Sequence, residues 1–366
     1  MADHGSSRVR RHHRRRTRSD RGVLLSTPTA VLLLGFGGPE GPDEVVPFLE
    51  NVTRGRDVPP ERLAVVAEQY ALFGGVSPIN GQNRALRDAL DAELRRRDRG
   101  VPVYWGNRNW APYVADTMAE IAAEGHTSIV ALATSAYSSY SSCRQYQDDL
   151  RGAVDRVGDA APEWVKVRPF WNHPGFILAM VERVHSALEA VSPAQLDKTR
   201  LVFTAHSIPL SMATTSDYET QLRDAAQLIS ERLAVDLDHD VVFQSRSGPP
   251  QVPWLEPDIV DHLGSLSAQQ VDSVVVVPIG FISDHMEVVY DLDTLAADAA
   301  AELGMSLMRA ATVGTHPLFV RGLVDLIDEH LADGVPKALG DLGPRRSPCA
   351  ADCCPPPTRP ATRAQS

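Results

Sequence analysis

Short, uninterrupted runs of apolar residues alternate with longer amphipathic segments along most of this chain. Each run is short enough to form a strand that is buried on both faces. Eight runs stand out, at residues 31–34, 101–106, 128–134, 165–171, 200–206, 240–245, 273–281 and 306–313. Continuous apolar strands that alternate with helices predict parallel sheets with helices on both sides.

The segments between these runs have the composition of surface helices. Two examples are NRALRDALDAELRRRDR (83–99) and YETQLRDAAQLISERLA (218–234), which are rich in Ala, Leu, Arg and Glu. A long helical insert at about 41–100 and a near-equal division around residue 172 favour two halves over one closed barrel. The predicted fold class is α/β, with two Rossmann-like domains that each hold a four-stranded parallel sheet flanked by helices.

The same pattern gives the expected domain boundaries. The parts are a disordered basic leader (1–28), a first domain (29–172), a second domain (173–313), a last helix (314–335) that returns to the first domain, and a Cys-containing C-terminal extension with a flexible tail (336–366). We expect the leader to be disordered because it contains almost no apolar side chains to bury.

Composition limits the classes of function. The 366 residues are 43% hydrophobic and 23% charged, as in ordinary globular proteins. No apolar run approaches the roughly 20 residues that a membrane span needs, so we expect no integral membrane contact. The net charge is −11 although residues 1–22 hold eight Arg and two Asp. An acidic body argues against nucleic acid as the main partner, and we expect a cytoplasmic protein.

Titratable side chains follow two of the predicted strands. His206 ends one run, while Asp284, Glu287 and Asp291 follow the run 273–281. Ligands of open α/β sheets bind at the carboxyl ends of strands, and a neutral imidazole there can accept a proton or bind a metal. The three carboxylates, spaced i, i+3 and i+7, are expected on one helical face. Such a face suits mobile protons or a hard divalent cation.

Other residues near the strand ends suggest a large flat ligand with carboxylates. The glycine-rich turn 35–38 lacks G-x-G-x-x-G and the P-loop pattern, which excludes a dinucleotide. Arg54 and Arg56 lie on a predicted loop and could hold carboxylates through forked hydrogen bonds. Aromatic residues gather along the same predicted rim: Phe36, Tyr70, Tyr104, Trp105, Trp110, Tyr137, Tyr140, Tyr146 and Trp254.

Six segments in order resemble the ferrochelatases, which insert ferrous iron into a porphyrin. They are LLLGFGGP (32–39), YALFGGVSPI (70–79), YWGNRNWAP (104–112), FTAHSIP (203–209), FQSRSGPPQVPWLEP (243–257) and PIGFISDHMEVVYDLD (278–293). The likeness covers about residues 30–335. It implies two Rossmann-like domains with a porphyrin cleft between them.

The resemblance also implies roles for particular residues. The family's histidine falls on His206 and its acidic partner on Glu287, which implies a pair that binds Fe²⁺ and handles protons. Asp291 is implied as a further carrier of protons or iron. The family's porphyrin contacts fall on Ser77, Tyr146, Arg54 and Arg56, with Tyr70 nearby.

The chain departs from the family at two positions. Some relatives have a tyrosine that ligates the product's iron where this chain has Phe36. In others the acidic row extends one more turn, to the position that Leu295 occupies here, which makes an outer metal site doubtful.

The four cysteines match a further feature of some ferrochelatases. These relatives hold a [2Fe-2S] cluster with one mid-chain cysteine and three in a C-terminal extension. The chain has Cys143 together with Cys349, Cys353 and Cys354, and four thiolates are the usual ligands of such a cluster. Incidental free thiols and a zinc site are the alternatives. The expected role of the cluster is structural, tying the C-terminal extension to the main body.

The segment NVTRGRDVPPERLAVVAEQY (51–70) indicates which porphyrin is the substrate. It carries arginines where membrane-associated relatives that use protoporphyrin carry an apolar lip. A polar, basic mouth favours coproporphyrin III, with four propionates, and the cluster-bearing pattern resembles the enzymes of high-GC Gram-positive bacteria that use it. The product would be Fe-coproporphyrin III (coproheme), and transient contact with the next enzyme of the haem pathway is expected.

Four other functions are weighed at this point. They are a protoporphyrin IX ferrochelatase, a non-catalytic porphyrin or haem carrier, a cobalt or nickel chelatase for a more reduced tetrapyrrole, and an iron–sulfur electron carrier, which would leave the predicted cleft unexplained. The porphyrin or haem carrier ranks low because His206 and Glu287 are both present.

Overall fold

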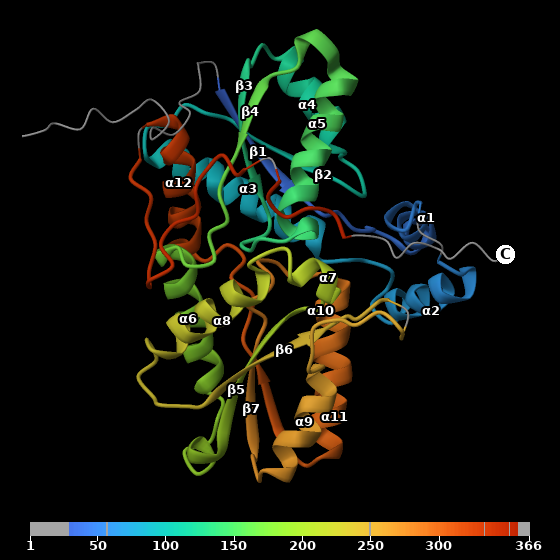
Figure 1. The fold of residues 1–366 in the computed structure, drawn as a ribbon, viewed down its shortest axis with the longest axis vertical. Coiled ribbons are helices and arrows are strands. Elements are labelled where there is room, and N and C mark those ends of the chain that lie inside the picture. Colours follow the sequence, from blue (N-terminus) through green and yellow to red (C-terminus); the bar gives the residue numbers. More distant parts are fainter. Residues whose placement is uncertain (1–28, 56–57, 249, 333, 351, 358–366) are drawn as a thin grey trace, which may run out of the picture.

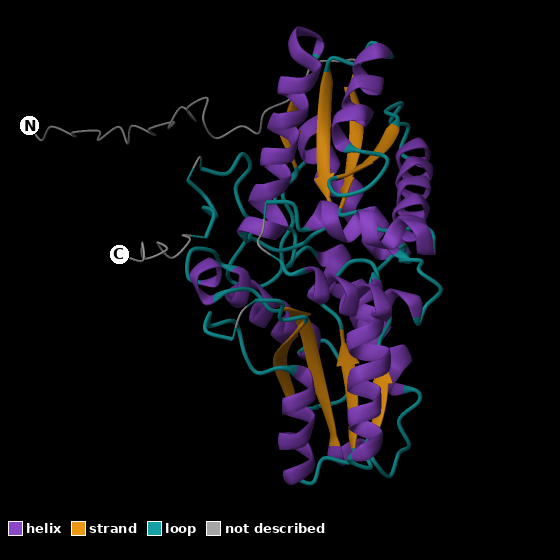
Figure 2. Ribbon diagram, turned by 90° about the vertical axis from the view of Figure 1, so that its right-hand side faces the viewer, coloured by secondary structure: helices purple, strands orange, loops and turns teal. Residues whose placement is uncertain are grey.

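Two parallel sheets, joined end to end, form the body of the protein. The computed structural model describes residues 29–55, 58–248, 250–332, 334–350 and 352–357. One sheet occupies the upper half of Figure 1 and the other the lower half. Figure 2 shows that the strands of the two sheets point toward each other, so their carboxyl ends meet at the middle of the molecule.

The first sheet has the strand order β2-β1-β3-β4, and all its pairings are parallel. Its strands are β1 (Thr29–Gly35), β2 (Val103–Asn107), β3 (Ser128–Ala133) and β4 (Glu163–Lys166). The second sheet repeats this design in the order β6-β5-β7-β8. Its strands are β5 (Thr199–His206), β6 (His239–Gln244), β7 (Ser273–Val277) and β8 (Ser306–Arg309). The predicted α/β class with two four-stranded parallel sheets is confirmed.

One predicted strand is misplaced. The apolar run 165–171 was expected to be extended along its length, but β4 ends at Lys166. Beyond that point Phe170 and Trp171 are buried in the core between helices. Pro169 could not donate a ladder hydrogen bond there. The apolar run therefore covers the end of a strand and the buried segment that follows it.

Helices cover both faces of each sheet. In the first half they are α1 (Pro42–Val52), α2 (Pro60–Ala71), α3 (Ile79–Arg96), α4 (Val114–Ala123), π-helix η2 (Tyr140–Arg144), α5 (Gln145–Val157) and η3 (Gly158–Ala160). In the rest of the chain they are α6 (Pro174–Leu188), η4 (Leu196–Lys198), α7 (Leu210–Ala213), α8 (Tyr218–Ser230), α9 (Ile259–Ala268), α10 (Met286–Tyr290), π-helix η5 (Asp291–Ala296), α11 (Ala297–Glu302) and α12 (Pro317–Leu331).

The alternation of side chains along the central strands divides the core into layers. Val31 and Leu33 of β1 share one core with Leu201 and Phe203 of β5, together with α3, α6, α8 and α12. The opposite face of the first sheet packs on α4 and α5, and that of the second sheet packs on α9, α10 and the helices that follow. No helix among the described residues is long and apolar enough to span a membrane.

Close approach of two glycines lets α12 pack on α6. A Cβ atom at Gly322 would lie 2.8 Å from Nδ1 of His173 and 3.0 Å from Cα of Gly175, so a larger residue would not fit. His173 caps α6 by accepting a hydrogen bond from the backbone N–H of Gly175. An ion pair of Arg97, at the end of α3, with Asp325 joins α3 to α12.

The segment after α12 runs back along the first half as a C-terminal strap, which we define as residues 336–350. Arg168 forms a forked ion pair with Glu329 of α12 and also donates to the carbonyl of Lys337 at 2.9 Å. Asn172 donates to the carbonyl of Gly343 at 2.9 Å. These contacts direct the strap, with Cys349 in it and Cys353 and Cys354 just beyond it, toward η2.

Candidate active site

The facing ends of the two sheets hold an imidazole and a carboxylate in contact. His206 is the last residue of β5, and Glu287 lies in the first turn of α10, shortly after β7. Nε2 of His206 lies 3.5 Å from Oε2 of Glu287. Nδ1 lies 2.5 Å from the carbonyl oxygen of Ser207, which can only accept, so Nδ1 carries a proton. The structure therefore brings together the two residues that the sequence singled out first.

This contact shifts the pKa of both groups. Burial opposes the charged imidazole, but hydrogen bonding and the charge of Glu287 outweigh it and raise the pKa of His206. Desolvation opposes ionisation of Glu287, although its side chain is still 52% exposed, but hydrogen bonding and charge from His206, with a contribution from His285, lower its pKa to about 2. The pair favours an imidazolium beside a carboxylate. It can therefore hold a proton, or exchange it for a cation that binds both side chains.

Asp291 lies one turn beyond Glu287, where α10 passes into η5. Ser245 and Gln244, at the end of β6, both donate to its Oδ2, with Gln244 Nε2 at 3.3 Å. Burial raises the pKa of Asp291 to about 6, although these two donors favour the charged form. Leu295, one further turn along, is 41% exposed and ends the row of carboxylates.

The expectation that three carboxylates share one helical face was wrong for Asp284. This residue precedes α10, whose N-cap is His285. Its carboxylate pairs with Arg309 of β8 at 3.0 Å, and its backbone N–H donates to Gln82 of α3. Asp284 thus connects the two halves of the molecule instead of joining Glu287 and Asp291.

An arginine that follows the end of a predicted strand lies among the aromatic residues. The guanidinium of Arg108 lies 5.3 Å from the ring centroid of Tyr146 and 5.9 Å from that of Phe36. Its side chain is 8% exposed and pairs with Asp149 at 3.2 Å. Its position directly after the run 101–106 was the available signal, since strand ends carry ligands.

Not all the predicted aromatic residues line this site. Tyr137 is fully buried, and its hydroxyl donates to the carbonyl of Ile279, so it belongs to the core. Tyr104 instead donates to Glu124. Phe36, which is 38% exposed, and Tyr146, which is buried, face the guanidinium of Arg108.

The other predicted contacts lie on α1, α2 and the turn before α3. Ser77 is 3% exposed, and its backbone N–H donates to the carbonyl of Pro39 in the glycine-rich turn. Tyr70 packs with Phe48 and with Met286 of α10. Burial and, to a lesser extent, Glu287 raise the pKa of Tyr70. Arg54 is exposed in the turn after α1, and Arg56 lies outside the described residues.

The surface around α1 and α2 also carries apolar side chains. Exposed residues here are Val46 (52%), Val65 (49%), Leu72 (68%) and Val76 (44%). Figure 1 shows α1 and α2 at the level where the two halves meet. The region 51–70, for which the sequence predicted a polar and basic surface, therefore lies beside exposed apolar side chains as well.

The four cysteine thiols form two close pairs. Sγ of Cys353 and Sγ of Cys354 are 3.6 Å apart, and the thiols of Cys143 and Cys349 share a hydrogen bond. That hydrogen bond, helped by Lys166, lowers the pKa of Cys143 to about 5 despite burial. The pKa of Cys349 is raised by the same contact. Within the part of the chain that the structure describes, no group of three or more His, Cys, Asp or Glu side chains is placed so that it could hold a metal ion.

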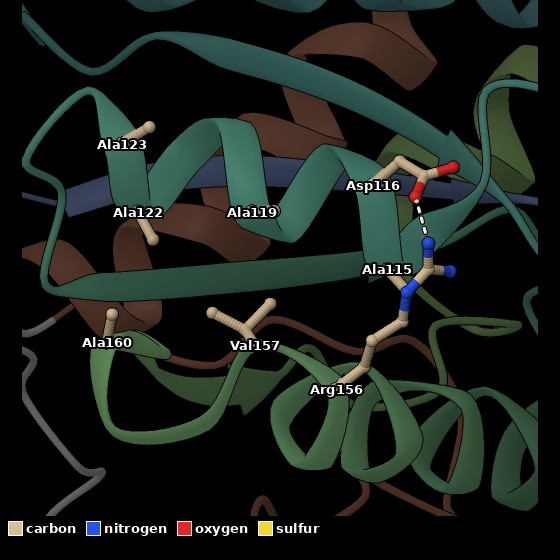
Figure 3. A pocket seen from close by; sticks show the side chains of 8 residues that line it. All are labelled: Ala115, Asp116, Ala119, Ala122, Ala123, Arg156, Val157 and Ala160. Atoms are coloured by element: carbon tan, nitrogen blue, oxygen red, sulfur yellow. Dashed lines mark hydrogen bonds and ion pairs between the residues drawn. The ribbon is translucent and has the colours of Figure 1, made fainter.

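A surface pocket of about 420 Å³ lies away from all these residues, between α4 and α5 (Figure 3). Five alanines make up most of its lining, and an ion pair of Arg156 with Asp116 at 2.8 Å closes one end. The two charged side chains of the pocket, Arg156 and Asp116, already pair with each other. We interpret it as a gap in the packing of two helices.

Comparison with known proteins places this geometry in a class. The structure is similar to SirB from Bacillus subtilis with Fe³⁺, with a TM-score of 0.51, 12% identity, and coverage of 83% of this chain and 96% of that one. This likeness shows the fold alone, an α/β arrangement. The sequence model of the ferrochelatase family matches residues 28–331. The chain therefore belongs to the ferrochelatase family.

Relatives within this family are similar over nearly their whole length. A coproporphyrin III ferrochelatase from Nocardia farcinica is 50% identical over 345 residues, which cover 91% of this chain and 98% of the relative. One from Frankia alni is 52% identical over 340 residues, covering 90% and 87%. A protein named ferrochelatase from Rhodopirellula baltica is 50% identical over 327 residues, covering 88% and 92%.

Proposed function

We propose that this chain is a coproporphyrin III ferrochelatase, which inserts Fe²⁺ into coproporphyrin III to give Fe-coproporphyrin III and two protons. The observation that carries the proposal is the contact between His206 and Glu287 at the facing ends of the two sheets. Relatives from Nocardia farcinica and Frankia alni, each at least 50% identical, are named for this activity.

The pair can perform the proton and metal steps of the insertion. Two pyrrole N–H bonds break and four Fe–N bonds form, so total charge is conserved and no electron is transferred. In our proposal His206 accepts a pyrrole proton when its imidazole is neutral. Glu287, ionised because its pKa is about 2, stabilises the resulting imidazolium and binds incoming Fe²⁺. Asp291 passes protons outward.

We propose that the macrocycle is held by residues of the first half. In this proposal Ser77 and Tyr146 contact the ring, and Arg54 with Arg56 binds propionates. Tyr70 packs against Met286 of α10. Arg108 adds a positive charge to the wall formed by Phe36 and Tyr146, which suits a flat ligand with carboxylates.

A protoporphyrin IX ferrochelatase is the second candidate. The exposed apolar side chains of Val46, Val65 and Leu72 favour it, because a less polar macrocycle with two propionates would tolerate an apolar mouth. The basic residues of the same region, Arg54 and Arg56, favour the more acidic coproporphyrin.

We further propose that the four cysteines hold a [2Fe-2S] cluster. Two pairs of thiols, Cys143 with Cys349 and Cys353 with Cys354, provide the four sulfur ligands that such a cluster requires. A pairwise arrangement fits two iron atoms better than one zinc ion, which needs all four ligands around a single point. When bound, the cluster would supply Fe–S bonds that link the C-terminal extension, through Cys349, Cys353 and Cys354, to Cys143 of η2. The expected domain boundaries, the cytoplasmic location and a contact with the next pathway enzyme stay predictions.

The test is anaerobic insertion of Fe²⁺ into coproporphyrin III and protoporphyrin IX, side by side, with His206→Ala as control. A higher kcat/KM for coproporphyrin III supports the proposal. A higher value for protoporphyrin IX keeps the chelatase and overturns our substrate. Tight binding of both porphyrins without insertion, in wild type as in the variant, would make the protein a carrier.

A further inference from the structure

The carboxyl end of β6 is fixed next to His206. Gln244, its last residue, pairs with His206 in the sheet, and its carbonyl accepts a hydrogen bond from the N–H of Ser207 at 2.8 Å. Gln244 is 1% exposed. The end of this strand is therefore held against the end of β5, the strand that carries His206.

The next residue, Ser245, has a backbone conformation that requires an explanation. Its φ is 62°, in the left-handed region that residues with a Cβ atom rarely adopt. Such conformations are costly, and they persist where the surrounding contacts hold them. At Ser245 the conformation turns the hydroxyl toward Oδ2 of Asp291, to which it donates a hydrogen bond.

Gln244 and Ser245 use the same carboxylate oxygen. Nε2 of Gln244 lies 3.3 Å from Oδ2 of Asp291, and the Ser245 hydroxyl donates to that atom as well. Two donors on Oδ2 fix the orientation of the carboxyl group and leave Oδ1 to take up a proton. Asp291 is also the first residue of π-helix η5, and π-helical turns occur frequently at functional sites.

We propose that Gln244 and Ser245 are positioning residues that hold the Asp291 carboxyl group as the outward proton acceptor for His206 and Glu287. The proposal rests on the proposed function for its chemistry. In each transfer one N–H or O–H bond breaks on the inner group and one O–H bond forms on Asp291. The proton then passes to water, and the oxidation state of iron is unchanged. Because the donors favour the ionised carboxylate, they keep Asp291 ready to accept.

The first test does not depend on activity. Infrared titration of the porphyrin-free protein would follow the band of the protonated carboxyl group, assigned by its loss in Asp291→Asn. Removing the hydroxyl in Ser245→Ala should raise the midpoint of this band by about one pH unit, since a hydrogen bond to a charged group is lost. Ser245→Asn, which keeps a donor and tolerates the left-handed conformation, should restore the midpoint. Ser247→Ala, two residues along the same loop, is the matched control and should leave it unchanged.

The second test connects the position to insertion. Ser245→Ala should lower kcat about tenfold with an unchanged Kd for coproporphyrin III, and should have no further effect in Asp291→Asn, because both changes remove one function. Independent losses in the double variant, or an unmoved infrared midpoint in Ser245→Ala, would overturn the proposal. Absence of insertion in wild type would instead refute the proposed function, and the infrared result would still decide the placement of Asp291.

Discussion

The buried ion pair that anchors the C-terminal strap gives a prediction whose size follows from its geometry. Side-chain exposure is 1% for Arg168 and 8% for Glu329, and Nη2 lies 2.9 Å from Oε1. Arg168→Met removes one charge and leaves the Glu329 carboxylate buried without its partner. Breaking a buried pair in this way costs about 3–5 kcal/mol. The carbonyl of Lys337 loses a donor as well, which adds about 1 kcal/mol.

The assay is urea unfolding, followed by circular dichroism and by the fluorescence of the tryptophans. Arg156→Met is the matched control, since its pair with Asp116 is 66% and 55% exposed and exposed pairs contribute less than about 1 kcal/mol. The double variant Arg168→Met with Glu329→Leu should recover much of the loss, because no unpaired charge remains. If Arg168→Met costs no more than Arg156→Met, the strap is not anchored as described.

Four further variants test the site and the thiols. His206→Ala should reduce Fe²⁺ insertion by orders of magnitude while porphyrin binding, measured by fluorescence quenching, persists; normal turnover would exclude His206 from the mechanism. Glu287→Gln should lower the pKa of His206, followed by NMR, because the carboxylate raises it in the wild type; an unshifted titration would contradict the pairing. The stabilisation from the raised His206 pKa is complete below pH 6.5 and is lost as pH rises through the folded value. Arg54→Ala should weaken coproporphyrin III binding more than protoporphyrin IX binding, and equal losses would refute its contact with the additional propionates. Cys349→Ser should bleach a visible [2Fe-2S] spectrum, whereas an unchanged spectrum would return the cysteines to incidental thiols.

Apolar runs located the strands because burial on both faces leaves few alternatives for short segments. Seven of the eight runs coincide with strands whose ends differ by a few residues. The run 165–171 overlaps β4 only at its start, because Phe170 is apolar for a different reason, namely its ring contacts with Phe176 of α6 and Phe319 of α12. A hydrophobic run indicates burial, and only Pro169, inside the run, indicated that the segment leaves the sheet.

The prediction that Asp284, Glu287 and Asp291 share one helical face was wrong for Asp284, because the local pattern does not show where the helix begins. The interval from Asp284 to Asp291 is helical only if one regular helix covers it. The chain instead begins α10 at Met286 and changes to π-helical turns at Asp291. The spacing of a few acidic residues does not show where a helix begins or where it changes to π-helical turns. The direction of the Asp284 carboxylate is set by its ion pair with Arg309.

The positions of strand ends explain which residues reach the site, and contacts between residues far apart in the sequence explain their protonation. The rule that ligands bind at carboxyl ends of parallel strands selects His206, Arg108 and Ser245 from the sequence alone. Their partners, Glu287, Asp149 and Asp291, lie between 41 and 81 residues away along the chain. The contacts of His206, Glu287 and Asp291 shift their pKa values, so the protonation of the site follows from the three-dimensional contacts and not from any local pattern. This is why the chemistry of a ferrochelatase can be located from its sequence, while the direction in which its protons leave has to be argued from the fold.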